Sequence, residues 1–188
     1  VTLHAPWQSA ASMFSETWSY RSWQERGKVE DKVAEKLRSL IDVVSRGGNY
    51  LLNIGPDGTG AVVPFEREVL LQIGKWLEEN GDAIYGTQPS PYKEEFEWGD
   101  VTVKGNDMYL LLTGKYPEEG YIELKLGHAG KTGCRVDVDR KMYADPADVH
   151  VIKVNFGGES WREVSFLSGH EALSWKNATP HYSYSCFD

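Results

Sequence analysis

The stretch that decides the fold is the run Gly47-Gly48-Asn49-Tyr50-Leu51-Leu52-Asn53-Ile54-Gly55-Pro56. Its centre, residues 49–54, is short and largely apolar and has glycine on both sides. Strands that are buried on both faces have this pattern, and such strands usually belong to parallel sheets covered by helices. The run therefore predicts a buried strand of a parallel sheet.

A predicted helix lies on each side of this strand. Before it, apolar residues recur at three- and four-residue spacing over residues 29–44, which is one helical face, and Gly47-Gly48 ends that helix. After it, residues 56–60 are a turn cluster, and Pro64 marks the first turn of a second helix that closes at Asn80-Gly81. The whole segment, residues 27–86, predicts a helix–strand–helix unit of a (β/α) fold, and an isolated unit of this kind cannot bury both faces of its strand.

The hydrophobic pattern changes near residue 90. Residues 89–92 (Pro-Ser-Pro-Tyr) are typical of a stiff connector, and beyond them apolar and polar residues alternate, as in half-buried strands. The strand candidates are Val101/Val103, residues 108–112, Ile122/Leu124/Leu126, Val136/Val138, residues 149–156 and Tyr182/Tyr184/Cys186. Short strands separated by glycine-rich turns predict an antiparallel β-sandwich. The predicted organisation is α/β over residues 1–88, followed by an all-β domain over residues 89–188.

Composition excludes several classes of protein. With 188 residues, 40% of them hydrophobic, the chain has enough apolar material for a packed core, which excludes intrinsic disorder. Its net charge of -8 argues against holding the phosphate backbone of a nucleic acid. No apolar run reaches the roughly 18 to 20 residues that a membrane-spanning helix needs. The two cysteines, Cys134 and Cys186, allow at most one disulfide, and the sequence leaves their pairing open.

The N-terminal stretch is dense in aromatic residues that follow no clear period. They are Trp7, Phe14, Trp18, Tyr20 and Trp23. The missing period predicts a loop. Loops at the carboxyl-terminal rim of a (β/α) barrel carry the active site, and Trp and Tyr there commonly stack on sugar rings. The alternative is that these rings close the barrel mouth or pack against a neighbouring domain.

Further motifs lie at Pro6-Trp7-Gln8, at residues 15–20 (Ser-Glu-Thr-Trp-Ser-Tyr) and at residues 40–56, and they continue through Gly74-Lys75-Trp76-Leu77 to about residue 90. Together they resemble the end of the catalytic domain of the α-L-fucosidases, glycoside hydrolase family 29. The resemblance implies a fragment: the last βα elements of an incomplete (β/α) barrel, followed by most of the family's C-terminal β-sandwich.

The resemblance also implies the chemistry, which is that of a retaining exo-α-L-fucosidase acting on terminal α-L-fucose of glycans or glycoconjugates. An Asp nucleophile would form a covalent fucosyl-enzyme intermediate, and a second carboxyl group would act first as acid and then as base. No cofactor or metal would be needed. The nucleophile is expected upstream of Val1, so the fragment alone would be inactive.

The identity of the acid/base is open. In many members of the family a Trp-Glu pair stands where this chain has Trp7-Gln8, and that Glu is the acid/base. The Gln8 amide cannot donate a proton at any useful pH. Three alternatives remain: another loop supplies the acid and Gln8 donates a hydrogen bond, Glu16 is the acid, or hydrolysis has been lost. No catalytic residue is therefore assigned with certainty.

The resemblance implies a substrate site as well, and its expected residues are Trp7, Gln8, Trp18, Tyr20 and Asn53. Asn53 either faces the pocket from the carboxyl end of its strand or satisfies the turn around Gly55-Pro56. The expected partner is a fucosylated oligosaccharide, with no nucleic acid and no membrane span, and the family suggests a secreted, periplasmic or lysosomal protein. Two other functions stay open: a non-catalytic carbohydrate-binding protein of the same fold, and a β-sandwich interaction module.

Overall fold

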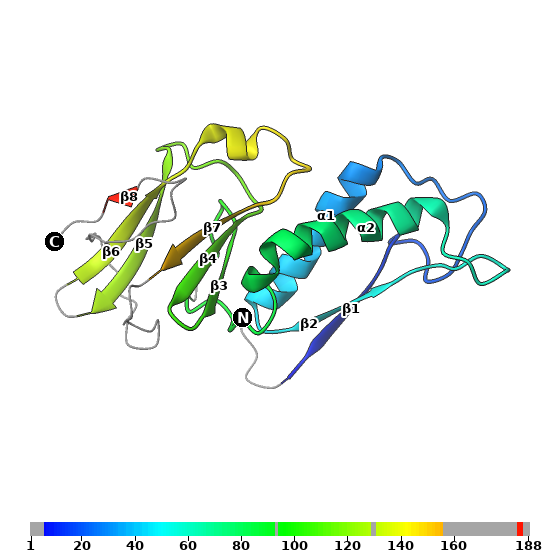
Figure 1. Cartoon of the computed structure of the whole chain (residues 1–188), viewed down its shortest axis with the longest axis horizontal. Coiled ribbons are helices and arrows are strands. Elements are labelled where there is room, and N and C mark those ends of the chain that lie inside the picture. Colours follow the sequence, from blue (N-terminus) through cyan, green and yellow to red (C-terminus); the bar gives the residue numbers. More distant parts are fainter. Residues whose placement is uncertain (1–5, 93, 129–130, 156–183, 186–188) are drawn as a thin grey trace.

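The structure, a computed structural model, describes residues 6–92, 94–128, 131–155 and 184–185. Two parallel strands open the fold, β1 (Gln8–Ser12) and β2 (Asn49–Asn53), and helix α1 (Val29–Ser45) connects them. Helix α2 (Pro64–Asn80) and the short 3-10 helix η1 (Gly81–Ala83) follow β2. Figure 1 shows both long helices on the same side of the strand pair.

The boundaries of the helices follow from the local sequence. α1 ends just before Gly47, whose φ of 80° lies in the left-handed region that favours glycine. α2 begins at Pro64, where a missing N–H costs nothing because the donors of a first turn have no partner within the helix. The apolar residues that the two helices bury in a shared core are Val33, Leu37, Ile41, Val69 and Ile73. The predicted helix–strand–helix order is confirmed.

One prediction about the strands is wrong. The sequence predicts a loop for the aromatic stretch, but its residues Gln8–Ser12 form β1, in parallel register with β2. This segment is mostly Ser and Ala, which carry little strand signal, so pairing with β2 determines its structure. β2 has the apolar pattern of a strand buried on both faces, but, as expected for an incomplete unit, none of its residues is fully buried and Leu51 is 43% exposed. Helices cover one side of this strand pair, and the other side is open in the described part of the chain.

The second half contains two antiparallel sheets, each of three strands within the described residues. In the first sheet the strand order is β3 (Asp100–Lys104), β4 (Asp107–Leu112) and β7 (His150–Asn155). In the second it is β5 (Tyr121–His128), β6 (Lys131–Asp137) and β8 (Tyr184–Ser185), and the 3-10 helix η2 (Arg140–Tyr143) lies between β6 and β7 in the chain. The strands predicted between residues 101 and 155 are confirmed. Of the last predicted strand, Tyr182 and Cys186 lie outside the described residues.

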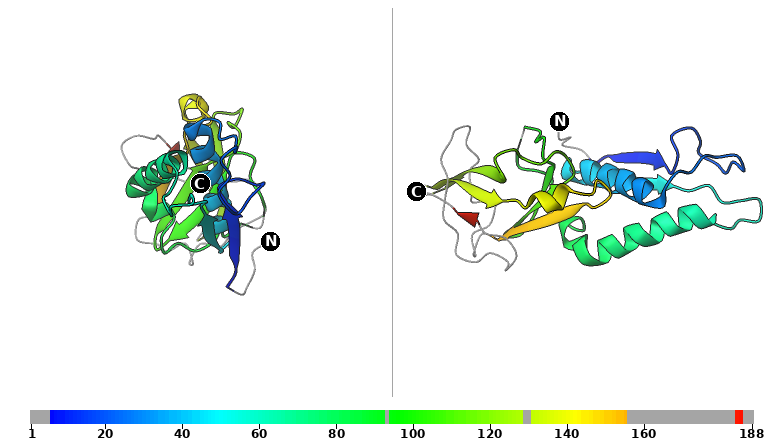
Figure 2. Two further views of the ribbon diagram at one scale, coloured as in Figure 1. Left: turned by 90° about the vertical axis from the view of Figure 1, so that its right-hand side faces the viewer. Right: turned by 90° about the horizontal axis from the view of Figure 1, so that it is seen from above.

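The β3–β4–β7 sheet is the middle layer of the molecule, with the helices toward one end and the β5–β6–β8 sheet toward the other (Figures 1 and 2). One face of this middle sheet shares a hydrophobic cluster with β5 and β6. Residues Tyr109 and Leu111 of its other face join the core of the two helices. The indole N–H of Trp76 on α2 donates to the Val149 carbonyl oxygen (2.7 Å), which fastens a helix to the start of β7. The helices therefore pack against the middle sheet as well as against each other.

Candidate functional site

The candidate site lies at the edge where β1 and β2 end, because parallel strands bring their carboxyl ends to the same edge. Two loops leave this edge: residues 13–28, called here the aromatic loop, and residues 54–63. Figure 1 shows both loops at the end of the molecule that is far from the β5–β6–β8 sheet. Loops in this position carry binding and catalytic groups in (β/α) folds.

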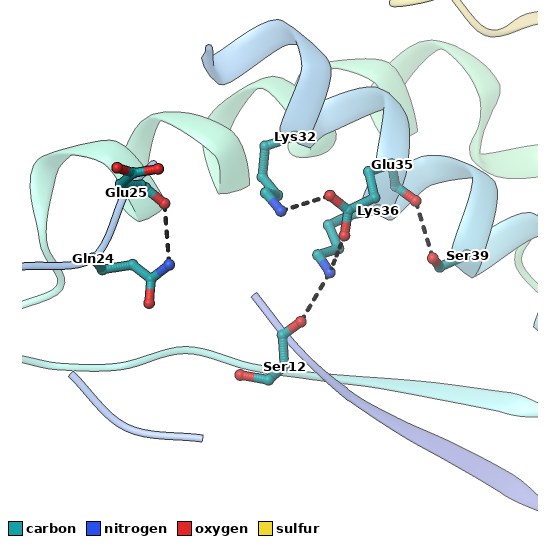
Figure 3. Close-up of polar contacts among 7 residues, drawn as sticks. All are labelled: Ser12, Gln24, Glu25, Lys32, Glu35, Lys36 and Ser39. Carbon is teal, nitrogen blue, oxygen red and sulfur yellow. Dashed lines mark hydrogen bonds and ion pairs between the residues drawn. The ribbon is translucent and has the colours of Figure 1, made fainter. Parts of the chain in front are cut away.

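A buried lysine fixes the end of β1. Lys36 of α1 is only 6% exposed, and its Nζ donates to the Ser12 carbonyl oxygen (2.8 Å) and pairs with Glu35 (2.6 Å). Lys32 pairs with the other oxygen of the same carboxylate (2.5 Å; Figure 3). Burial raises the pKa of Glu35, but the hydrogen bonds and charges of the two lysines outweigh it and hold this pKa below its usual value. The network holds α1 against the last residue of β1.

Asn53, the last residue of β2, binds the aromatic loop. Its Nδ2 donates to the Trp18 carbonyl oxygen (2.9 Å) and lies 3.4 Å from the Ser12 hydroxyl oxygen. The Ser12 hydroxyl in turn donates to the Thr17 carbonyl oxygen. Side chains at the ends of both strands therefore hold the loop backbone. Of the two alternatives for Asn53, the structure shows a backbone contact, made to the aromatic loop rather than to the turn at Gly55-Pro56.

Gly55 lets the aromatic loop approach the end of β2. A Cβ added to Gly55 would lie 2.8 Å from the backbone nitrogen of Tyr20 and 3.0 Å from the carbonyl carbon of Ser19, which is too close for any larger residue. The Gly55 N–H donates to Oε2 of Glu66 (2.9 Å), a carboxylate in the first turn of α2 that is only 3% exposed. Glu66 thus fixes the turn over which residues 19–20 pass.

The backbone of the aromatic loop is held, yet three of its ring side chains face solvent. Trp18 is 60% exposed, Tyr20 39% and Trp23 77%. Phe14 differs, because it is buried and stacks on Phe65 with ring centroids 6.0 Å apart. The exposed rings present flat apolar faces with polar tips, which suit a partner that is apolar on one face and hydroxylated at its rim.

Trp7 and Gln8 lie at the opposite edge of the strand pair. Gln8 is the first residue of β1 and pairs with Asn49, the first residue of β2. At about 3.3 Å per residue, the strand separates Gln8 from Ser12 by about 13 Å. The Trp7 ring packs on Gly48, where an added Cβ would lie 2.5 Å from the indole Cζ2. The structure does not bring Trp7 and Gln8 together with the residues at the carboxyl-terminal edge.

Glu16 lies on the aromatic loop, between β1 and Trp18, and is exposed. Its carbonyl oxygen accepts a hydrogen bond from the Arg21 guanidinium (2.8 Å). Glu16 therefore shares the edge with Trp18 and Tyr20, whereas Gln8 does not.

Two hollows lie away from this edge. The first, of about 630 Å³, is between the end of α1 and the start of β3, and the second, of about 740 Å³, is between the helices and residues 145–151. Neither is lined by a residue of the aromatic loop. In the part of the chain that the structure describes, no cluster of His, Cys, Asp and Glu is arranged to hold a metal ion. No helix there has the length and apolar character to cross a membrane.

Three residues that shape the edge are not predicted from the sequence: Ser12, Lys36 and Glu66. A signal for two of them exists, because Lys36 stands three positions after Val33 and Glu66 three before Val69, which places each charge on the apolar face of its helix. A charge on such a face needs a buried partner. Ser12 has no such signal, since its role depends on a strand that the sequence does not predict.

Comparisons with known proteins point to one family. Residues 1–82 match the family model described as Alpha-L-fucosidase. Human tissue alpha-L-fucosidase is 38% identical over 121 residues, which cover 63% of this chain and 26% of that protein. The structure of alpha-L-fucosidase isoenzyme 1 from Paenibacillus thiaminolyticus matches with a TM-score of 0.56 at 31% identity, over 71% of this chain and 30% of that one.

The Thermotoga maritima alpha-fucosidase in complex with fucose matches with a TM-score of 0.59 over 80% of this chain and 40% of that one, and at 24% identity it shows the fold alone. The chain spans 25 to 31% of the length of the tissue alpha-L-fucosidases that it matches. The resemblance found in the sequence is thereby confirmed: residues 1–82 carry the sequence pattern of the α-L-fucosidases.

Proposed function

We propose that this chain is part of a retaining exo-α-L-fucosidase that removes terminal α-L-fucose from glycans or glycoconjugates. The observation that carries the proposal is the family match over residues 1–82, a range that includes β1, α1, β2, α2 and the whole aromatic loop. The exposed rings at the carboxyl-terminal edge of the strand pair support it, because sugar-binding sites offer such rings for stacking.

In this proposal residues 1–88 are the end of a (β/α) barrel and residues 89–188 a β-sandwich domain. The parallel strands with a helical crossover support the first assignment, and the hydrophobic cluster shared by the two antiparallel sheets supports the second. A full barrel takes about 250 residues. Further barrel strands would cover the open face of the strand pair, where Leu51 is exposed.

The side chains at the edge then have distinct tasks. Trp18 and Tyr20 contact the sugar, and Asn53 positions both through the Trp18 carbonyl oxygen. Trp7 and Gln8, at the other edge, stabilise the start of β1 instead of touching the substrate. Glycosidases of the retaining class hold two carboxyl groups roughly 5 to 5.5 Å apart, one as nucleophile and one as acid and then base.

The acid/base comes from a segment other than Trp7-Gln8. An amide has no proton to give, and Gln8 stands about 13 Å along β1 from the edge. We favour a loop outside this chain as its source. Glu16 is the alternative within the chain, because it is a carboxyl group on the aromatic loop beside Trp18.

The test compares the 188-residue chain with the full-length protein that contains it, using α-L-fucosyl fluoride and a fucosylated trisaccharide as substrates. We expect the full-length protein to release fucose, with the α-anomer appearing first in a proton NMR time course, and the 188-residue chain to release none. Turnover by the 188-residue chain alone would overturn the assignment. Retention of the full-length protein on immobilised fucosylated glycan without turnover would identify a carbohydrate-binding protein instead.

A further inference from the structure

Trp23 is the most exposed large apolar side chain of the described residues, at 77%. An indole is among the most favourable side chains to bury, and Trp23 is one of three exposed rings on the same loop, a grouping that points to a partner more than a single exposed ring would. The proposed fucose contacts, Trp18 and Tyr20, lie on the same loop and are less exposed. Trp23 has no assigned role in the proposed function.

The segment that carries Trp23 is locked by its own polar side chains. The Arg26 guanidinium donates to the carbonyl oxygens of Gln24 (2.9 Å) and Arg21 (3.2 Å), and the Gln24 N–H closes a turn onto the Arg21 carbonyl oxygen (3.2 Å). The Gln24 amide donates to the carbonyl oxygen of Glu25 (3.0 Å; Figure 3). The polar groups of this segment therefore bind its backbone, while its indole is left facing outward.

The two parts of the aromatic loop are held by different neighbours. The backbone at Trp18 and Tyr20 lies against Asn53 and Gly55 at the end of β2. The hydrogen bonds that the structure gives for the turn around Trp23 all join groups of the loop itself. The hydrogen bonds therefore divide the loop into a part fixed to the end of β2, which carries Trp18 and Tyr20, and a separate turn, which carries Trp23.

We propose that Trp23 binds the saccharide unit to which the fucose is attached, by stacking on the apolar face of that ring. This rests on the proposed fucosidase function. An indole face attracts the C–H face of a pyranose and tolerates several linkages, because it makes no directional hydrogen bond to the ring. Trp23 thus makes the enzyme prefer oligosaccharide leaving groups to small ones.

The charged side chains of the aromatic loop are of both signs, Glu16 and Glu25 against Arg21, Arg26 and Lys28. The guanidinium groups of Arg21 and Arg26 donate to loop carbonyl oxygens, so their N–H groups serve the loop itself. Stacking on an indole needs no charge on the sugar. The ligand class that we assign is therefore a neutral pyranose linked to fucose.

The test uses the full-length protein with Trp23→Ala and Trp23→Phe, and it compares a neutral fucosylated trisaccharide with α-L-fucosyl fluoride, whose leaving group has no ring. We expect Trp23→Ala to lower kcat/KM for the trisaccharide about five- to tenfold, mainly through KM, and to leave kcat/KM for the fluoride within about twofold. Trp23→Phe restores most of the loss, because a ring face returns.

Tyr85→Ala is the matched control, since Tyr85 is also exposed (60%) but follows η1, away from the aromatic loop. We expect it to change neither substrate. The assignment would be overturned if Trp23→Ala lowered kcat/KM equally for both substrates or for neither. A lowered unfolding temperature for Trp23→Ala would also overturn it, because it means that other parts of the protein cover the indole. Absence of any turnover by the unmodified protein refutes the proposed function itself, and so the two failures are distinguishable.

Discussion

The buried carboxylate of Glu66, on α2, fixes the backbone over which the aromatic loop passes at the end of β2. Its Oε2 accepts the Gly55 N–H, and Gly55 lies directly under the backbone of Tyr20. The carboxylate also sits in the first turn of α2, where the helix dipole favours a negative charge. A single side chain thereby links a helix, a turn and the aromatic loop.

We expect Glu66→Ala to lower the free energy of unfolding of the 188-residue chain by about 1 to 3 kcal/mol, because the buried Gly55 N–H loses its acceptor. Glu66→Gln should cost less, since the amide oxygen can accept the same bond. Urea denaturation followed by tryptophan fluorescence measures both. Glu68→Ala is the control, because Glu68 is exposed on the same helix and its side chain is hydrogen bonded to Gln72. Equal costs for the Glu66 and Glu68 variants would contradict the role of Glu66.

Gln8 allows a second prediction at this scale. Because it lies at the amino end of β1, about 13 Å from Ser12, Gln8→Ala in the full-length enzyme should change kcat/KM for an aryl α-L-fucoside by less than about threefold. Gln8→Glu should bring no gain for the same reason. A loss of a hundredfold or more for Gln8→Ala would show that Gln8 reaches the reacting sugar and that the edge is wrongly placed.

At the scale of elements, the sequence predicts what has a strong period. α1 and α2 have apolar stripes and clear ends at Gly47 and Asn80-Gly81, and β3, β4 and β7 alternate or are apolar, so all five are predicted. β1 is not, because Ser and Ala give no strand signal and only its partner β2 determines its conformation. The pattern of β2 fits burial on both faces, but its residues are only partly covered in this chain. A pattern shows which residues could be buried, not which neighbours are present.

For the same reason, the sequence and the structure agree on only some of the residues that share the candidate site. The resemblance points to Trp18, Tyr20 and Asn53, and the structure brings these three to one edge. The resemblance groups Trp7 and Gln8 with these three as well. The five residues of β1, however, carry the chain from one end of the strand pair to the other, so the two groups lie apart. Because the sequence does not predict β1, it cannot show which end of this segment lies at the carboxyl-terminal edge of the strand pair.

Asp100 joins elements from both halves and leads to a pH-dependent prediction. Its carboxylate accepts hydrogen bonds from Ser45 at the end of α1 and from Thr113 after β4 (both 3.0 Å). Burial raises the pKa of Asp100 above its usual value, and these two bonds offset this only in part. The folded state therefore holds the proton more tightly than the unfolded state. Stability from this group is present below the usual aspartate pKa and is lost as pH rises through the raised one.

We expect Asp100→Asn to flatten this dependence. Between about pH 4 and pH 7 the variant should gain unfolding temperature relative to the unmodified chain, because it carries no buried charge and its amide oxygen can still accept a hydrogen bond. Thermal unfolding at several pH values measures the difference. Asp148→Asn, at an exposed carboxyl group near β7, should show no such trend. A difference between Asp100→Asn and the unmodified chain that shrinks as pH rises would contradict the assignment.

At the scale of the whole molecule, stability is spread unequally between the layers. The middle sheet has neighbours on both faces, and Met108, Leu110 and Leu111 of β4 are at most 1% exposed. α1 and α2 share the core on one side of that sheet, so their stability depends on it. The strand pair β1–β2 is farther out, and within the described residues β1 has a neighbour on one edge only. A free strand edge is also a template for pairing between molecules.

Hydrogen exchange on a verified monomer of the 188-residue chain tests this order. Amides of β4 should exchange near the limit set by global unfolding, because their strand is paired on both edges and buried on both faces. Amides of Tyr50–Asn53 should exchange at least about a hundredfold faster, which corresponds to about 2.7 kcal/mol of easier opening, because β2 belongs to a two-stranded sheet with one open face. Amides of α1, which packs against the middle sheet, should exchange at rates between those of β4 and β2. Equal protection of β2 and β4 would falsify the view that β1–β2 is the open end of a barrel, since a strand pair that closes its own core needs no further strands to cover it.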